Sequence, residues 1–163
     1  MTTRPWRIHL RTLAAAGLTS LAIALAAPGS AEAGRMACVN PRDEFALNAR
    51  VLQTELMVAA LACGEAKRYN AFVTTFRREI AAQGSSLRRL FARAYGSAGN
   101  SQLNAFVTRL ANDASGRSAA GGGRYCAAAA SLMAEALATK PSDFERLTRS
   151  SSLSARHPFP RCR

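Results

Sequence analysis

The sequence predicts an all-α protein: an antiparallel four-helix bundle with a short C-terminal helix, stapled by disulfides. Three observations favour this fold. Four segments repeat apolar residues with a period of about 3.6, and none alternates apolar and polar residues as a half-buried strand would. The segments are separated by short loops, which makes successive helices antiparallel. The four cysteines, an even number, follow a predicted export signal, which favours disulfides.

Residues 1–33 have the composition of a secretory signal peptide. Three arginines precede an apolar stretch at 13–27, and residues 31–33 form a small-x-small cleavage site. An uncleaved anchor is the alternative, but the apolar stretch is short for a membrane span. The sequence therefore predicts a periplasmic or secreted protein with a helical bundle domain at 34–149 and a Ser/Pro/Arg-rich tail at 150–163.

The chain is strongly basic. Its net charge is +12, and removal of residues 1–33 leaves 130 residues with 19 basic and 9 acidic side chains, or +10. This balance attracts anionic partners, such as envelope lipid, lipopolysaccharide, nucleic acid or an acidic protein. An Arg- and Ala-rich composition also arises from the codon bias of a GC-rich genome, so the charge alone does not establish binding.

The segment 41–63 predicts the central helix. Asn40 suits the N-cap, Pro41 suits the first helical position, and Gly64 follows the last apolar residue. Apolar residues occupy two nearly opposite faces, which indicates a helix buried between neighbours. A membrane span is the competing interpretation, but charged and polar residues interrupt the run of about 20 apolar residues that a span needs.

A second long helix is predicted from about 68 to 95. Its apolar stripe keeps the same period through Gly84, so we expect the helix to continue there at a cost of roughly 1 kcal/mol relative to alanine. A break at residues 84–86 is the alternative. Gly96 ends the helix, and residues 96–100 are expected to form a loop.

The remaining segments predict two further long helices and a short one. The third helix is expected at about 101–115, followed by a flexible Ser/Ala/Gly loop at 118–123. The fourth is expected at about 124–139, where many alanines permit close packing, and Pro141 stops it. A short helix around Phe144 then leads into the tail.

The topology selects one disulfide pairing of the three possible. Cys38 and Cys63 flank a helix about 33 Å long, and a disulfide needs Cα atoms within about 7 Å. If the second helix is continuous, successive helices are antiparallel, which places Cys63 and Cys126 at one end of the bundle and Cys38 and Cys162 at the other. The sequence therefore predicts the pairs Cys63–Cys126 and Cys38–Cys162.

No motif for catalysis, a metal or a cofactor occurs in the sequence. It lacks a His-Glu-x-x-His pair, a phosphate-binding glycine loop and a Cys-x-x-Cys-His haem site. His157, the one histidine after residue 33, lies beside Pro158 in the tail and is a poor partner for a nucleophile. We therefore expect no metal and no cofactor, and we favour a protein without enzymatic activity.

Asn48 and Glu55 are candidates for a polar pocket. They lie seven residues apart, in the seam between the two apolar faces of the central helix. One interpretation is a pocket of a small periplasmic enzyme or ligand carrier. The other, which we favour, is an ion pair between Glu55 and an arginine of the second or third helix.

The basic residues of the second helix are candidates for anion binding. Three cations recur every 11 residues, which predicts one ridge opposite the apolar stripe, and three arginines flank it. The ridge comprises Lys67, Arg78 and Arg89, and the flanking residues are Arg77, Arg88 and Arg93. An ordinary solvated helix face fits the pattern as well, and we weigh it above a rail for phosphates. No exposed aromatic residues are interleaved, which argues against nucleic acid.

Three stretches resemble a family of small exported bacterial helical proteins of unknown function. They are NARVLQTELMVAAL at 48–61, YNAF at 69–72 and LNAFVTRLAN at 103–112. The resemblance covers most of residues 38–137, and it implies export and a helical fold but no catalytic residues. Some members are labelled adenosylhomocysteine hydrolase, but this chain is far too short for that enzyme and lacks its dinucleotide loop. Our leading hypothesis is an exported bundle that acts through its basic surface on an anionic envelope component or an acidic protein.

Overall fold

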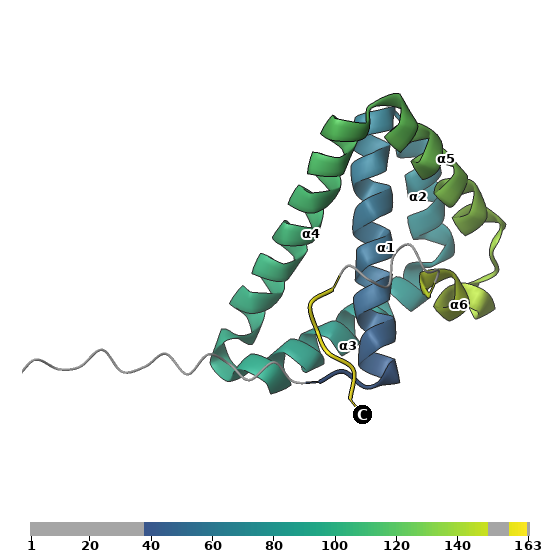
Figure 1. The fold of residues 1–163 in the computed structure, drawn as a ribbon. Coiled ribbons are helices and arrows are strands. Elements are labelled where there is room, and N and C mark those ends of the chain that lie inside the picture. The colour runs from purple at the N-terminus through teal and green to yellow at the C-terminus, as the bar shows by residue number, and fades with distance from the viewer. Residues whose placement is uncertain (1–37, 150–156, 163) are drawn as a thin grey trace, which may run out of the picture. The chain divides into compact units, whose positions relative to one another are not determined.

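The computed structural model describes residues 38–149 and 157–162, which form a helical bundle closed by two disulfides (Figure 1). The elements are α1 (Pro41–Cys63), α2 (Ala66–Thr75), α3 (Arg77–Tyr95), α4 (Gly99–Gly121), α5 (Gly123–Ala138) and α6 (Phe144–Thr148), with single 3₁₀ turns at Gly96–Ala98 and Pro141–Asp143. The all-α, disulfide-stapled fold is therefore confirmed. The predicted signal peptide and residues 150–156 of the tail lie outside the described residues, and the domain boundaries stay predictions.

Helix α1 is the centre of the bundle and has the predicted bounds. The Asn40 side chain accepts a hydrogen bond of 2.9 Å from the Asp43 backbone N–H, and Gly64 ends the helix with a φ of 75°. All the other α-helices pack against α1. Among the described residues, α1 alone has the length and hydropathy of a membrane span, and 67% of its most apolar stretch is buried inside the bundle, as in a core helix.

The second helix bends at Phe76, which the sequence analysis did not predict. It continues through Gly84 as expected, but α2 and α3 point in different directions (Figure 1). The Phe76 N–H bonds Phe72 O at 3.0 Å, and the Ile80 N–H bonds Phe76 O at 2.9 Å, so Phe76 is at once the C-cap of α2 and the N-cap of α3. The expectation of one long helix from about 68 to 95 is therefore wrong, because α2 ends at Thr75 and α3 begins at Arg77. The bend lets α2 pack on α1 and α5 while α3 packs on α1 and α4.

Helix α4 is longer than the sequence analysis predicted. It begins at Gly99, inside the expected loop, and it ends at Gly121, six residues beyond the expected end. The flexible loop expected at 118–123 is wrong, because residues 118–121 are helical and Gly122, with a φ of 51°, reverses the chain. Serine and alanine are tolerated in a helix, so the positive φ at a single glycine is sufficient for the turn.

Both predicted disulfides are present. The Cα atoms of Cys63 and Cys126 are 5.6 Å apart, and those of Cys38 and Cys162 are 4.8 Å apart. All four cysteines are paired, which indicates an oxidising environment outside the cytoplasm. The Cys38–Cys162 disulfide holds residues 157–162 beside the start of α1, where the Val39 N–H donates to Pro160 O at 2.8 Å.

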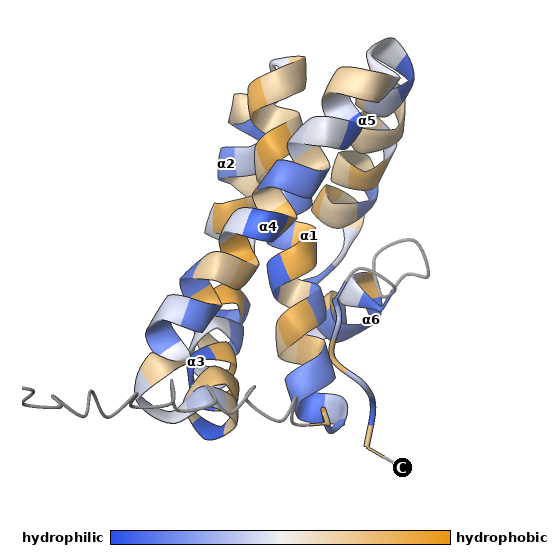
Figure 2. Ribbon diagram, turned by 60° about the vertical axis from the view of Figure 1, so that its left-hand side comes forward, coloured by the Kyte–Doolittle hydropathy of each residue, from blue (hydrophilic) through white to orange (hydrophobic). Residues whose placement is uncertain are grey.

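The core lies around α1 and contains two groups of aromatic rings. Phe72, Phe76 and Phe144 form one group, with centroids 4.9–6.4 Å apart. The other group joins α3, α4 and the C-terminal segment, and it comprises Phe91, Phe106 and Phe159. In Figure 2, apolar residues dominate the middle turns of α1, whereas polar residues recur along α3 and α4. The outward side chains of α3 and α4 are therefore carried by helices whose inner faces are buried.

Candidate anion-binding site

The bend at Phe76 divides the predicted basic ridge. Lys67 lies on α2, whereas the other five cations lie on α3, which points in another direction (Figure 1). One continuous ridge from Lys67 to Arg89 is therefore wrong. On α3 itself the 11-residue spacing is preserved, because Arg77 lies in line with Arg88, and Arg78 with Arg89.

Four arginines of α3 are exposed and have no carboxylate partner among the described residues. They are Arg77, Arg78, Arg88 and Arg89, and we call them the α3 basic face. The guanidinium of Arg88 donates to Ser85 Oγ at 3.1 Å, and that of Arg89 donates to Ser86 Oγ at 2.9 Å, both one turn back on the helix. These bonds orient the two side chains without neutralising them.

Arg93 has a structural role and does not belong to this face. Its Nη2 donates to both carboxylate oxygens of Asp43, each at 2.8 Å, and Asp43 is buried in the first turn of α1. The pair joins the end of α3 to the start of α1. Arg93, a predicted anion-binding residue, is therefore occupied by a carboxylate of its own chain.

Ion pairs elsewhere in the described residues neutralise six arginines. The pairs are Arg68–Glu65, Arg93–Asp43, Arg117–Glu55, Arg146–Asp143, Arg149–Glu145 and Arg161–Glu44. Most acidic residues are thus used in pairs away from the α3 basic face. Among the described helices, α3 carries the largest group of cations without an ion pair, Arg77, Arg78, Arg88 and Arg89.

Glu55 forms the predicted ion pair. Its carboxylate accepts from Arg117 Nη2 at 2.6 Å, and Arg117 lies in the part of α4 that the sequence analysis assigned to no helix. The pair borders a cavity of about 130 Å³, which is also lined by Val51, Leu110 and Asp113. This volume corresponds to about four water molecules at roughly 30 Å³ each.

Asn48 does not line that cavity with Glu55. Its side chain is 1% exposed, and its amide atoms have no hydrogen-bond partner among the residues that the structure describes. The two candidates of the predicted polar pocket therefore share α1 but not a common site.

An open cleft of about 680 Å³ lies where α1, α3 and α4 meet. Its polar and flexible lining residues are Arg50, Gly84, Arg88, Asn100, Asn104 and Thr108, and its apolar ones are Leu103 and Val107. No acidic residue lines it. Arg88 thus belongs both to the α3 basic face and to this cleft.

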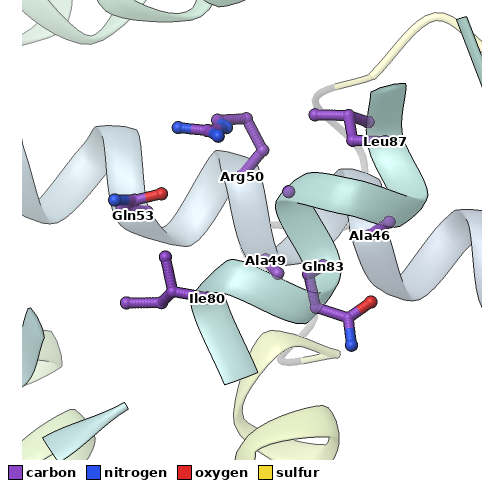
Figure 3. A pocket seen from close by; sticks show the side chains of 8 residues that line it. Ala46, Ala49, Arg50, Gln53, Ile80, Gln83 and Leu87 are labelled. Carbon is purple, nitrogen blue, oxygen red and sulfur yellow. The ribbon is translucent and has the colours of Figure 1, made fainter. Parts of the chain in front are cut away.

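Arg50 is the residue of this cleft that the sequence analysis missed as a site. Figure 3 shows it at a smaller hollow between α1 and α3, which is also lined by Gln53 of α1 and by Ile80 and Gln83 of α3. The side chain is half-buried and makes no ion pair with any described residue. Its position within the apolar run was a signal, but sequence gives no way to tell a paired arginine from an unpaired one.

Burial lowers the pKa of the Arg50 guanidinium below its ordinary value. Tyr69 acts in the opposite direction, and the positive charge of Arg88 lowers the pKa further. An arginine side chain remains charged at neutral pH in a protein. The cleft therefore holds a desolvated cation that feels a second cation nearby.

No grouping of three or more metal-ligating side chains occurs within 38–149 and 157–162. Comparisons with protein-family models, curated proteins and solved structures found no match for this chain. The resemblance to small exported bacterial proteins therefore stays a prediction. The arrangement of arginines is consequently the strongest functional feature that the described residues offer.

Proposed function

We propose that this protein is a non-enzymatic, exported binding protein that attaches to an anionic component of the cell envelope through the α3 basic face. The observation that carries the proposal is that its four exposed arginines have no carboxylate partner among the described residues, whereas six arginines elsewhere are paired. Clustered, unneutralised cations attract anionic lipid headgroups by about 1 kcal/mol each.

The packing of α3 on the core favours such a role. Leu87, Leu90 and Phe91 bury the opposite side of the helix against α1 and α4. The backbone positions of the arginines are therefore set by the folded helix, so binding requires ordering of their side chains only. No aromatic side chain is exposed among the described residues, so stacking on nucleic-acid bases has no support. An acidic protein is the second partner class that the same charges would attract.

The alternative of a small enzyme or ligand carrier near Glu55 has weaker support. The cavity of about 130 Å³ is smaller than the roughly 300–1,000 Å³ of typical ligand pockets. Glu55 is also paired with Arg117, as in a structural ion pair. We therefore assign Glu55 to stability and not to chemistry.

The export part of the proposal rests on the signal pattern at residues 1–33 and on the two disulfides. We infer a periplasmic or secreted protein whose mature chain begins at Gly34. Mass spectrometry of the protein recovered outside the cytoplasm would show that N-terminus, and an intact residue 1 would contradict it.

A binding titration tests the envelope proposal. The oxidised protein is titrated with vesicles that contain phosphatidylglycerol, with neutral vesicles and with duplex DNA, each at low and high salt. We expect binding to the anionic vesicles that weakens steeply with salt, and little binding to neutral vesicles. Equal binding to both vesicle types, or binding to DNA alone, would overturn the proposal.

A further inference from the structure

We propose that the cleft between α1, α3 and α4 binds a phosphate group, held between the guanidinium groups of Arg50 and Arg88. This goes beyond the proposed function, because a defined pocket would recognise one chemical group, whereas the α3 basic face attracts any anionic surface. The phosphate would be a monoester, carried either by a small solute or by a lipid headgroup.

Arg50 supplies the first part of the argument. It projects from the central helix into the cleft, and no described residue offers it a carboxylate or a hydrogen bond. A half-buried charge without a partner is costly, and most buried charges are paired. An anionic ligand in the cleft would supply the missing partner.

The second cation makes a dianion the best match. Arg88 lines the same cleft from α3, and its charge acts unfavourably on Arg50. With no acidic residue in the lining, nothing in the cleft offsets this repulsion. A phosphate monoester carries close to two negative charges at neutral pH, and arginine binds phosphate oxygens through paired N–H donors. A single carboxylate would neutralise only one of the two guanidinium groups.

The rest of the lining is suited to the remainder of such a ligand. Asn100, Asn104 and Thr108 bring amide and hydroxyl groups that can donate to oxygen atoms, and they come from the first half of α4. Gly84 has no side chain to fill the cleft, and even an added Cβ there would meet only Arg50 Nη2, at 3.9 Å. The volume of about 680 Å³ falls within the range typical of small-molecule sites.

An NMR titration with inorganic phosphate, at a pH above the second pKa of phosphate, tests this inference directly. We expect saturable shifts of the Asn100 and Asn104 side-chain amides and of the Arg50 Nε–H signal. Acetate at the same ionic strength should shift these signals far less. Shifts that do not saturate, or equal shifts with both anions, would overturn the proposal, and this readout requires no variant.

Substitutions then assign the binding to the two arginines. Arg50→Gln and Arg88→Gln should each weaken phosphate binding by about tenfold or more, because each removes a charge-assisted interaction. Arg109→Gln, at an exposed position of α4 outside the cleft, removes the same charge and should leave the affinity within about twofold. Equal losses in all three variants would mean that net charge alone attracts phosphate. Circular dichroism melts test whether each variant is folded. If Arg50→Gln does not fold, Arg88→Gln alone tests the proposal, because Arg88 is exposed and its replacement should not disturb the fold.

Two further arms distinguish the sources of the phosphate. Free glycerol 3-phosphate is compared with vesicles that contain phosphatidic acid, which presents the same group on a lipid. If Arg50 is needed for binding glycerol 3-phosphate but the vesicles do not bind, the ligand is a soluble phosphate. If Arg50 is needed for binding the phosphatidic acid vesicles as well, the ligand is a lipid headgroup. Failure of the phosphatidylglycerol vesicles to bind would contradict the proposed function and leave this inference standing, because its readout is a free anion.

Discussion

The rings of Phe76 and Phe144 stack with their centroids 4.9 Å apart, and both side chains are fully buried. Phe76 is the residue at which α2 gives way to α3, and Phe144 begins α6. The contact therefore joins the bend in the second helix to the short C-terminal helix. Phe72, on the other side of the bend, packs 5.2 Å from Phe76 and completes the group.

Removal of the Phe144 ring should destabilise the protein strongly. Phe144→Ala would leave a cavity beside Phe72 and Phe76, and such losses cost about 3–5 kcal/mol. Denaturant unfolding measures the change. Leu61→Ala is the matched control, because Leu61 is 80% exposed and its truncation should change the free energy of unfolding by less than about 0.5 kcal/mol. Similar losses for the two variants would contradict the role of the aromatic group.

Two glycines should respond in opposite directions to the same substitution. Gly84→Ala should raise the free energy of unfolding by up to about 1 kcal/mol, because the site is helical and an added Cβ meets only Arg50 Nη2, at 3.9 Å. Gly99→Ala should lower it by about 1–3 kcal/mol, because its Cβ would lie 3.0 Å from backbone atoms of Ala92. Thermal melts of both variants measure the two changes, and a destabilised Gly84→Ala would contradict a helix that continues through Gly84.

The ion pair between Arg93 and Asp43 should contribute to stability, in contrast to the α3 basic face. Arg93→Gln should lower the free energy of unfolding by about 1–2 kcal/mol, since it leaves a buried carboxylate without its charged donor. Arg78→Gln, on the same helix and without a carboxylate partner, should have an effect below about 0.5 kcal/mol. Urea titrations of the two variants would contradict this assignment if Arg78→Gln were the more harmful.

The stability of the C-terminal segment should depend on pH through His157. Burial lowers the pKa of His157 below its ordinary value of 6.5; Glu44 and a backbone hydrogen bond with Phe159 oppose the shift, and Arg161 adds to it. The unfolded chain therefore binds the proton more readily, so this contribution is complete above pH 6.5 and is lost as pH falls below it. When the pH is lowered from about 7.5 to 5, the melting temperature should fall more in the wild type than in His157→Gln. Parallel pH profiles would contradict the assignment.

Local sequence signals predicted much of this fold, and they failed where the conformation depends on contacts with residues distant in the sequence. The bounds of α1 followed from Asn40, Pro41 and Gly64, and its two apolar faces indicated a central position. The disulfide pairing followed from the length of the first helix and from the directions of the helices. The bend at Phe76 left no local mark, because the apolar stripe continues through it and the ring that it packs against lies at residue 144.

The site was predicted less well than the fold. The cations of α3 could be read from their spacing, but the partner of Arg93 is Asp43, fifty residues away. Sequence could not show that Arg93 is paired while Arg50 is not, because pairing depends on which side chains meet across helices. Because the sequence analysis did not predict that α4 extends to Gly121, it did not identify Arg117 as the partner of Glu55.

A comparison of two triple variants that carry the same net charge tests the envelope proposal most directly. One replaces Arg77, Arg78 and Arg89 of α3 with glutamine, and the other replaces Arg109, Arg124 and Lys140, which lie on other elements and have no ion pair among the described residues. Both are titrated with phosphatidylglycerol vesicles at low salt. We expect the α3 variant to lose affinity by about 100-fold, at about 1 kcal/mol for each cation, and the other variant to lose far less. Equal losses would show that the total charge, and not the α3 basic face, attracts the membrane.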